Sequence, residues 1–255
     1  FAFVIYDIEN NRLFCARDRF GEKPFYYVIR NGEFVFASEI KAIKAYYSDL
    51  SIDYDKLQRY LNGDYWYGDI DTPFNEVVTL NPASYMTVDS SGINLMKYWD
   101  IDLNKKYNLV TDHDYFNKFQ ELFLKSVKVR LRSDVPVGSS LSGGLDSSAV
   151  VGSFSSLGVV DNHTFSARFK SNKDEGKWIA DVVEKHNLTS HEVWPAENGL
   201  IDDIEKITWH NEFPLASGSV YAQWCVMALP RKYGVKVLLD GQGADEFLCG
   251  YDELK

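Results

Sequence analysis

Strands and helices alternate through the second half of the chain, and this alternation restricts the fold more than any other feature. Apolar strands are expected at Val135–Leu141, Thr164–Phe169, His191–Trp194 and Val235–Leu239. Helical patterns separate or flank them at Ser147–Leu157, Glu175–His186, Leu200–His210 and Val220–Arg231, where Pro230 should end or kink the last helix. Such alternation forms a parallel sheet with right-handed crossovers, which binds ligands at the carboxyl ends of its strands. The sequence therefore predicts an α/β domain.

The first part of the chain is typical of strands and turns. Hairpins are expected around Asn10-Asn11 and around Asn31-Gly32, because these residues tolerate a positive φ. Short helices should follow at Glu39–Tyr46 and near Asp53–Leu61, before strands return around Asn81-Pro82 and Ser90–Gly92. A helix with an apolar stripe is then expected at Asp114–Arg132, with Thr111 or Asp112 as its N-cap. The boundary to the second half is expected near Asp100–Asp112, where the sequence is polar and aperiodic.

Composition narrows the class of function. The 255 residues are 45% hydrophobic and can bury a large core, and the net charge of −10 argues against a nucleic-acid or anionic-membrane surface. No apolar run approaches the roughly 18 residues of a membrane span. The cysteines form no CxxC pair, which favours free thiols in a reducing compartment. We therefore expect a soluble cytoplasmic protein that acts on small molecules.

The loop between the first strand and helix of the α/β part has the residues of an anion site. In the sequence LSGGLDSSAV, Gly143 and Gly144 allow close approach of the backbone, and the following helix start offers free N–H groups. A P-loop lysine is missing and Asp146 stands inside the loop, so a bridging Mg²⁺ is expected between carboxylate and phosphate. A capped turn without a ligand is the alternative.

A second acidic loop, DGQGADE, follows the expected strand Val235–Leu239. Its Asp245 is predicted to face the same pocket as Asp146 and to supply a second carboxylate to the metal. The alternative is again a turn with a capping acid. Two like charges placed together are costly in a site that only binds, so the pair favours catalysis.

These motifs resemble a known family. SGGLDSS and DGQGADEFLCGY together are similar to the synthetase domain of the glutamine-hydrolysing asparagine synthetases, which are PP-loop ATP pyrophosphatases. The upstream stretch FAFVIYDIENNRLFCARDRFGEKPFYYVIRNGEFVFASEIKAI resembles the closing part of that family's Ntn-type glutaminase domain. The resemblance implies a β-rich glutaminase part at 1–50, linker strands and a helix at 51–110, and an α/β parallel-sheet PP-loop synthetase domain at 111–255. It also implies that the chain is part of a longer protein.

The resemblance implies a reaction. The side-chain carboxylate of aspartate would attack the α-phosphorus of ATP, giving β-aspartyl-AMP and pyrophosphate, and ammonia from glutamine would displace AMP. The implied residues are Ser142, Gly143, Gly144, Asp146 and Ser147 for pyrophosphate, Leu141, Ala167, Asp240 and Gly241 around adenosine, Asp146 and Asp245 for Mg²⁺, Ser217, Ser219 and Gln223 for aspartate, and Gln242 and Asp245 for catalysis. Members of the family often dimerise, which implies a homodimer.

The sequence also departs from the family pattern. Gln242 stands where some members carry a glutamate, and a neutral amide cannot act as the base. We expect Gln242 to position the adenylate while Glu246, Asp240 or solvent takes the proton. Cys15 is expected to be a core thiol, because the family's nucleophilic cysteine would precede Phe1. Arg17, Asp18 and Arg19 are expected to brace a domain interface rather than to catalyse.

Two other functions stay open at this point. One is a related natural-product amide synthetase that activates another carboxylic acid. The other is a degenerate nucleotide-binding module that binds ATP without turnover.

Overall fold

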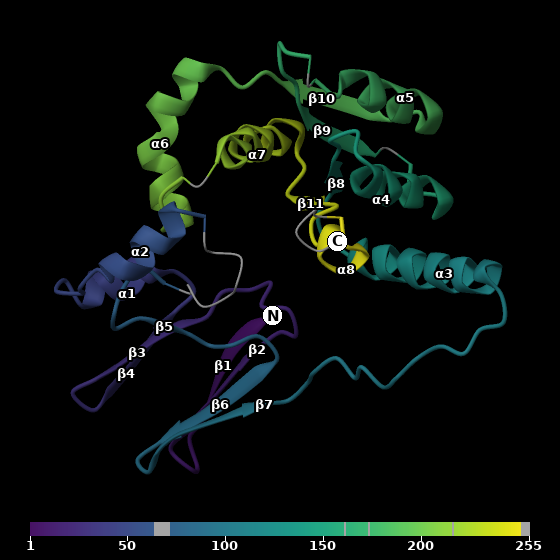
Figure 1. The fold of residues 1–255 in the computed structure, drawn as a ribbon. Coiled ribbons are helices and arrows are strands. Elements are labelled where there is room, and N and C mark those ends of the chain that lie inside the picture. The colour runs from purple at the N-terminus through teal and green to yellow at the C-terminus, as the bar shows by residue number, and fades with distance from the viewer. Residues whose placement is uncertain (64–71, 161, 173, 216, 251–255) are drawn as a thin grey trace. The chain divides into compact units, whose positions relative to one another are not determined.

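A computed structural model of the chain describes residues 1–63, 72–160, 162–172, 174–215 and 217–250, so residues 64–71 of the expected linker lie outside it. The chain divides into two compact units (Figure 1). The amino-terminal unit comprises Phe1–Tyr107 and Thr208–Ala216, and the carboxy-terminal unit comprises Asn108–Ile207 and Ser217–Lys255. Nothing in the sequence indicated that Thr208–Ala216 joins the amino-terminal unit.

Two antiparallel sheets form the amino-terminal unit. One has the order β1 (Ala2–Asp7), β2 (Arg12–Arg17), β6 (Ser84–Asp89) and β7 (Gly92–Lys97). The other has the order β4 (Glu33–Ala37), β3 (Tyr26–Arg30) and β5 (Val78–Thr79), and the helices α1 (Ile40–Tyr46) and α2 (Tyr54–Leu61) follow β4. Both predicted hairpins form, with φ values of 46° at Asn11, 53° at Asn31 and 78° at Gly32.

Two hydrophobic clusters of this unit explain the state of its buried cysteine and the position of α1. Cys15 is fully buried beside Phe25, Leu80 and Met86, and burial raises the pKa of its thiol to about 11. The thiol therefore stays protonated, in agreement with the expected core role. Ile40 and its neighbour one turn on, Ile43, fix α1 against β3 in a second buried cluster.

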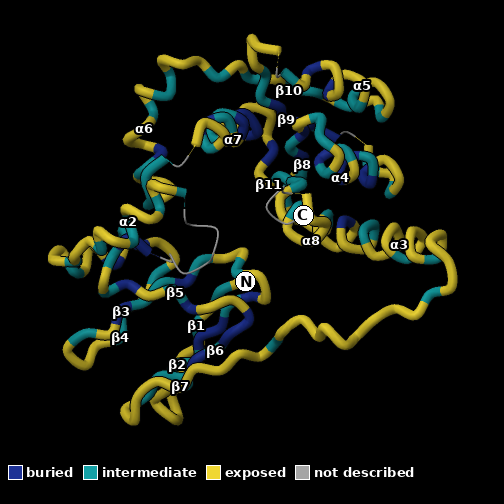
Figure 2. The backbone as a smooth tube through the Cα atoms, viewed as in Figure 1, coloured by how far each residue is buried: buried dark blue, intermediate teal, exposed yellow. Residues whose placement is uncertain are grey.

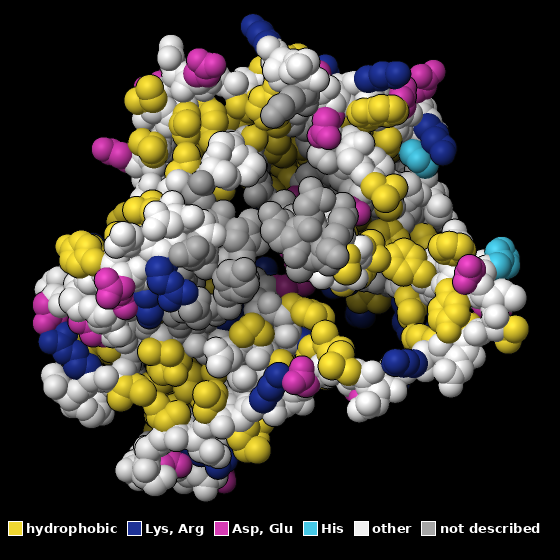
Figure 3. Space-filling view, in the orientation of Figure 1, with side chains coloured by type: hydrophobic (Ala, Val, Ile, Leu, Met, Phe, Trp, Pro, Cys, Tyr) yellow, Lys and Arg dark blue, Asp and Glu magenta, His cyan; other side chains and the backbone are white. Residues whose placement is uncertain are grey.

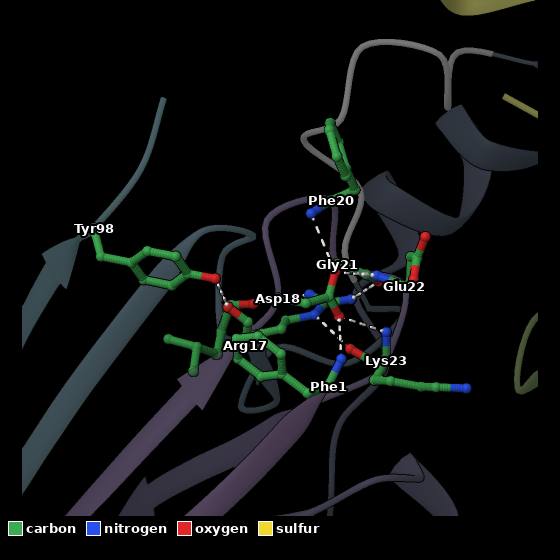
Figure 4. Close-up of polar contacts among 9 residues, drawn as sticks. Phe1, Arg17, Asp18, Phe20, Gly21, Glu22, Lys23 and Tyr98 are labelled. Carbon is green, nitrogen blue, oxygen red and sulfur yellow. Dashed lines mark hydrogen bonds and ion pairs between the residues drawn. The ribbon is translucent and has the colours of Figure 1, made fainter. Parts of the chain in front are cut away.

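The loop after β2 is held by buried charges (Figure 4). The Asp18 carboxylate accepts hydrogen bonds from the backbone N–H groups of Phe20, Glu22 and Lys23 at 3.0–3.1 Å. Burial alone would raise the pKa of Asp18, but these N–H groups outweigh it and hold the pKa well below its usual value. Arg17 donates to three main-chain carbonyl oxygens of the same unit at 2.7–2.8 Å. These contacts of Arg17 and Asp18 lie within the amino-terminal unit, and a role of Arg17, Asp18 and Arg19 at a domain interface stays a prediction.

The carboxy-terminal unit contains a parallel four-stranded sheet, which confirms the predicted α/β class. Its order is β10 (Thr189–Val193), β9 (His163–Ala167), β8 (Val137–Ser140) and β11 (Val237–Leu239). The helices are α3 (Asp112–Arg130), α4 (Leu145–Ser156), α5 (Gly176–His186), α6 (Glu197–Asn211), α7 (Gly218–Ala228) and α8 (Ala244–Leu248), and Pro230 opens the 3₁₀ turn η2 (Pro230–Tyr233) after α7 ends. Strand boundaries differ from the prediction by at most two residues. β8 starts after Pro136, which has no N–H group to donate to the sheet.

Helices cover both faces of this sheet. The strands β8 and β9 contain buried segments as a result (Figure 2). On one face α3 and α4 meet around Phe154 and Val150, and α5 joins α4 through Ile179. On the other face α7 contributes Val226 to a cluster around Phe165 of β9. The helices packed on both faces hold the carboxyl ends of the strands in place. The predicted loops begin at these ends.

The long helix α3 begins as the sequence predicted, since Thr111 and Asp114 form a capping box. Its apolar stripe is only partly buried. Val127 lies in the core, whereas Phe116 is 71% exposed, and hydrophobic side chains are visible on the surface over α3 (Figure 3). Among the described residues, no helix is long and apolar enough to cross a membrane.

Candidate functional site

The order of the parallel strands reverses between β8 and β11, the position at which open α/β sheets form a crevice. From β8 the chain moves outward to β9 and β10 on one side, and it returns to add β11 on the other side of β8. Ligands of open α/β sheets bind where the strand order reverses in this way, outside the carboxyl ends of the strands. Both loops singled out in the sequence start at this point, because one follows β8 and the other follows β11.

The first loop is shaped by its glycines. Gly143 has a φ of 85°, and a Cβ there would lie 3.0 Å from Cβ of Trp178 on α5, so the position requires glycine on both counts. Gly144 is the N-cap of α4, and it has no side chain that could accept a hydrogen bond from the N–H groups of the first turn. The N–H groups of that turn are therefore available to an anion.

Hydroxyl groups hold this loop in place. Ser142 Oγ and Ser147 Oγ lie 2.9 Å apart, and the Gly144 N–H donates to Ser142 Oγ at 3.2 Å. The helix α4 begins at Leu145, two residues before the prediction, so Asp146 lies in its first turn rather than in the loop. A carboxylate in the first turn is favoured by the helix dipole.

The second loop lies directly against the first. A Cβ on Gly241 would be 2.8 Å from Ser147 N and 3.0 Å from Asp146 Cβ, so only glycine allows this approach. Asp240 is tied to the end of β8, where it accepts from Ser140 Oγ at 2.9 Å. Gln242 is exposed in the turn that precedes α8.

The second acidic residue, Asp245, occupies the first turn of the short helix α8, as Asp146 does in α4. Each helix follows a glycine N-cap, Gly243 for α8 and Gly144 for α4. Among the residues that the structure describes, neither carboxylate forms an ion pair. The carboxylate of Asp245 lies against Gly250 after the end of α8, where a Cβ on that glycine would meet it. Its convergence with Asp146 on one cation stays a prediction.

The residues predicted around adenosine lie in different surroundings. The side chain of Leu141 is buried in the core with Val151 and Ile179, and its carbonyl accepts from Ser166 Oγ at 2.6 Å. Any contact of Leu141 with a ligand would thus come from its main chain. Ala167 ends β9 and faces the α7 side of the sheet.

A charged cluster that was not predicted from the sequence lies next to Ala167. Arg168 donates to Asp174 at 2.8 Å and to Glu192 at 2.6 Å, and its guanidinium lies 4.9 Å from the ring centroid of Trp194. These bonds raise the pKa of Arg168 and lower the pKa of Asp174 to about 2. The strand expected at Thr164–Phe169 contained Arg168, whereas β9 ends at Ala167, so no pattern in the sequence indicated this cluster.

The residues predicted to contact the acid substrate lie at the start of α7. Ser217 is the N-cap of this helix, and its Oγ lies 2.7 Å from Ser219 Oγ. Gln223 stands one helical turn after Ser219, so the two share an exposed face. The structure brings the two serines together, and the opposite side of α7 packs on β9 through Val226.

The fold and the two loops define an α/β protein in which the start of α4 and two acidic loops meet at the carboxyl edge of a parallel sheet. Comparison with known families is more specific. A family model described as asparagine synthase matches residues 118–255, and a model described as glutamine amidotransferase domain matches residues 1–99. The chain belongs to the asparagine synthase family, which confirms the resemblance predicted from its motifs.

Curated relatives extend this match over almost the whole chain. Asparagine synthetase [glutamine-hydrolyzing] 1 and 3 of Bacillus subtilis are 34% and 32% identical, over 99% and 98% of this chain and 39% and 43% of their own lengths. Amidase chry2 of Gibberella zeae is 29% identical over 100% of this chain and 40% of its own length. The chain thus spans less than half the length of each of these relatives.

A solved structure also shows a weak similarity. Glutamine-dependent NAD+ synthetase from Acinetobacter baumannii, in complex with ADP, aligns with a TM-score of 0.40 and 12% identity, over 98% of this chain and 61% of that one. A similarity at this level supports no conclusion about function.

Proposed function

We propose that the protein is an ATP-dependent ligase that forms an amide, with L-aspartate as the acid and ammonia from glutamine as the nitrogen donor. The observation that carries the proposal is the contact between the two loops at the β8–β11 crevice. Gly241 touches the first turn of α4 at Asp146 and Ser147, so an uncapped helix start and two acidic loops meet at one edge of the sheet. Membership of the asparagine synthase family supports the same reaction class.

In this proposal the loop after β8 holds the phosphates that leave as pyrophosphate. Gly143 and Gly144 let the backbone approach them, and Ser142 and Ser147 are already oriented by their mutual hydrogen bond. Asp240 and Gly241 would lie beside the adenosine with Leu141 and Ala167. The absence of a P-loop lysine fits a loop that releases pyrophosphate rather than transferring the terminal phosphate.

In this proposal Asp146 and Asp245 would hold Mg²⁺. Asp146 and Asp245 offer hard oxygen ligands, and among the described residues no group of three or more His, Cys, Asp or Glu side chains could hold a metal ion by itself. Mg²⁺ commonly takes one or two carboxylates and completes its shell with substrate phosphates and water. When bound, it would neutralise charge on the phosphates.

The attack by the acid requires groups that orient it. We propose that Ser217, Ser219 and Gln223 bind the amino-acid substrate from the start of α7. Gln242 is assigned a positioning role, because its amide can donate and accept hydrogen bonds but cannot take a proton near neutral pH. Homodimerisation and a cytoplasmic location are further predictions from the family resemblance.

ATP–pyrophosphate exchange tests this function. With Mg²⁺ present, exchange should depend on L-aspartate, and Asp146→Asn should reduce it on the order of 100-fold because the charge that holds the cation is lost. Exchange that depends on another acid would favour the related amide synthetases. ATP binding without exchange for any acid would contradict the proposal and favour a binding module.

The role of Gln242 has a separate test. We expect Gln242→Glu to leave aspartate-dependent exchange close to wild type, because the wild-type site moves the proton through another group. A large rise in exchange would show instead that Gln242 weakens the site.

A further inference from the structure

The loop proposed to bind phosphate, residues 142–144, lies against the start of α5, which packs beside α4 on one face of the parallel sheet (Figure 1). A Cβ on Gly143 would lie 3.2 Å from the carbonyl oxygen of Glu175 and 3.2 Å from the backbone nitrogen of Ile179. These two groups form the first hydrogen bond of α5, since the N–H of Ile179 donates to the carbonyl of Glu175 at 3.1 Å. The first turn of α5 is therefore a wall behind the phosphate loop.

The start of α5 is capped by a residue outside the helix. Its N-cap residue, Glu175, makes no capping bond with its own side chain. The carboxylate of Asp174 instead accepts the N–H of Gly176 at 3.3 Å, and it also accepts the N–H of Phe169 at 2.9 Å. Asp174 thus satisfies a free N–H of the first turn and ties that turn to the chain that leaves β9.

Arg168 holds Asp174 in this position. Its guanidinium donates from Nε to Oδ1 of Asp174 at 3.0 Å and from Nη2 to Oδ2 at 2.8 Å, which is the paired arrangement that fixes a carboxylate most firmly. The two side chains are only 20% and 18% exposed. The backbone N–H of Arg168 donates to the carbonyl of Val193 at 2.8 Å, so the guanidinium extends from a point anchored to β10.

Gly176 makes room for this guanidinium. A Cβ on Gly176 would overlap Nη2, Nε and Cζ of Arg168. Gly176 is buried and does not have a positive φ, so the position requires the missing side chain rather than a special backbone conformation. The guanidinium of Arg168 therefore lies directly on the first turn of α5.

Packing in the core holds the rest of α5. Ile179 lies in a buried cluster with Leu141 and Val151, so the helix stays on the sheet without help from Arg168. The carbonyl of Glu175 stands at the end of the helix, where turns fray first and where the cap by Asp174 restrains the chain. Loss of the Arg168–Asp174 pair should therefore loosen the wall behind Gly143 and leave the fold intact.

We infer that Arg168 and Asp174 are a positioning pair that holds the start of α5 against the phosphate loop and so prepares this loop for ATP. The inference rests on the proposed function and extends it to residues that need not touch ATP. Donors that are fixed before a ligand arrives bind it more tightly, because less freedom is lost on binding. Loss of the pair should weaken binding of ATP and leave the acid unaffected, because the residues proposed to bind the acid lie on α7, which packs on the other face of the sheet.

The test compares Asp174→Asn with Glu192→Gln by isothermal titration with a non-hydrolysable ATP analogue and Mg²⁺. Glu192 is a matched control, because it accepts from Nη1 of the same Arg168 at 2.6 Å but lies on β10 rather than at the start of α5. We expect Asp174→Asn to raise the Kd of the analogue about tenfold, the size of one charge-assisted hydrogen bond. Glu192→Gln should change this Kd less than about twofold, as should either variant the KM of the acid in ATP–pyrophosphate exchange.

A second variant keeps the test decisive if Asp174→Asn fails to fold. Gly176→Ala keeps every charge but displaces the guanidinium from the first turn, and it should raise the Kd of the analogue about threefold. Equal Kd values for Asp174→Asn and Glu192→Gln would overturn the inference while the proposed function stands. So would wild-type affinity in folded Gly176→Ala, or an equal rise in the KM of the acid. A wild-type protein that does not bind the analogue would overturn the proposed function first, and the inference with it.

Discussion

Substitution of Gly241 by alanine tests the contact between the two loops most directly. The added Cβ would lie 2.8 Å from Ser147 N and 3.0 Å from both C and Cβ of Asp146, whereas ordinary contacts begin at 3.4 Å. These atoms belong to the backbone and first turn of α4, so they cannot swing aside as the tip of a flexible side chain can. The loops would have to separate by roughly half an ångström, and overpacking of this kind costs about 1–3 kcal/mol.

That cost should appear as lost affinity for ATP. If only the closed arrangement of the loops binds ATP, Gly241→Ala should weaken binding by about fivefold to about a hundredfold. Gly152→Ala is the matched control, because a Cβ in the middle of α4 would meet His186 at an ordinary 3.5 Å. It should leave ATP binding unchanged and raise stability by about 1 kcal/mol through better helix propensity.

Isothermal titration with a non-hydrolysable ATP analogue measures the affinity, and circular dichroism checks that both variants are folded. Wild-type affinity in a folded Gly241→Ala protein would refute the role given to this contact. So would an equal loss of affinity in Gly152→Ala, because that residue lies away from the loops.

Two further predictions concern polar groups of the parallel sheet. Thr164 Oγ1 is buried without a hydrogen-bond partner among the described residues, so Thr164→Val should raise the free energy of unfolding by about 1 kcal/mol. Ser166→Ala, which deletes a satisfied hydrogen bond, should lower it, and the opposite ranking in urea titrations would contradict the reasoning. Burial and the neighbouring His163 keep the pKa of His191 below its usual value, so the unfolded chain takes up the proton more readily. Stability should therefore be complete above about pH 6.5 and fall below it. His191→Phe keeps a ring beside Tyr233 and should flatten the dependence of the urea midpoint on pH; an unchanged slope would exclude His191 as its source.

The local features of this protein were determined by its sequence. Hairpin turns followed from Asn31-Gly32, the start of α3 from its cap at Thr111, and the strand–helix alternation from apolar periodicity. Each depends on residues a few positions apart, whose backbone preferences and side-chain spacing act within one element. The two loops of the candidate site could also be predicted, because glycines and acids directly follow apolar strands.

The tertiary structure decided which of these elements meet. The sequence did not show that β11 pairs with β8, so the contact of Gly241 with Ser147 was not predictable from either loop alone. It also did not show that Leu141 would turn its side chain into the core. Glu212 reaches Ile40 across 172 positions. Such contacts depend on which faces pack together over the whole chain, and no local pattern of residues records that choice.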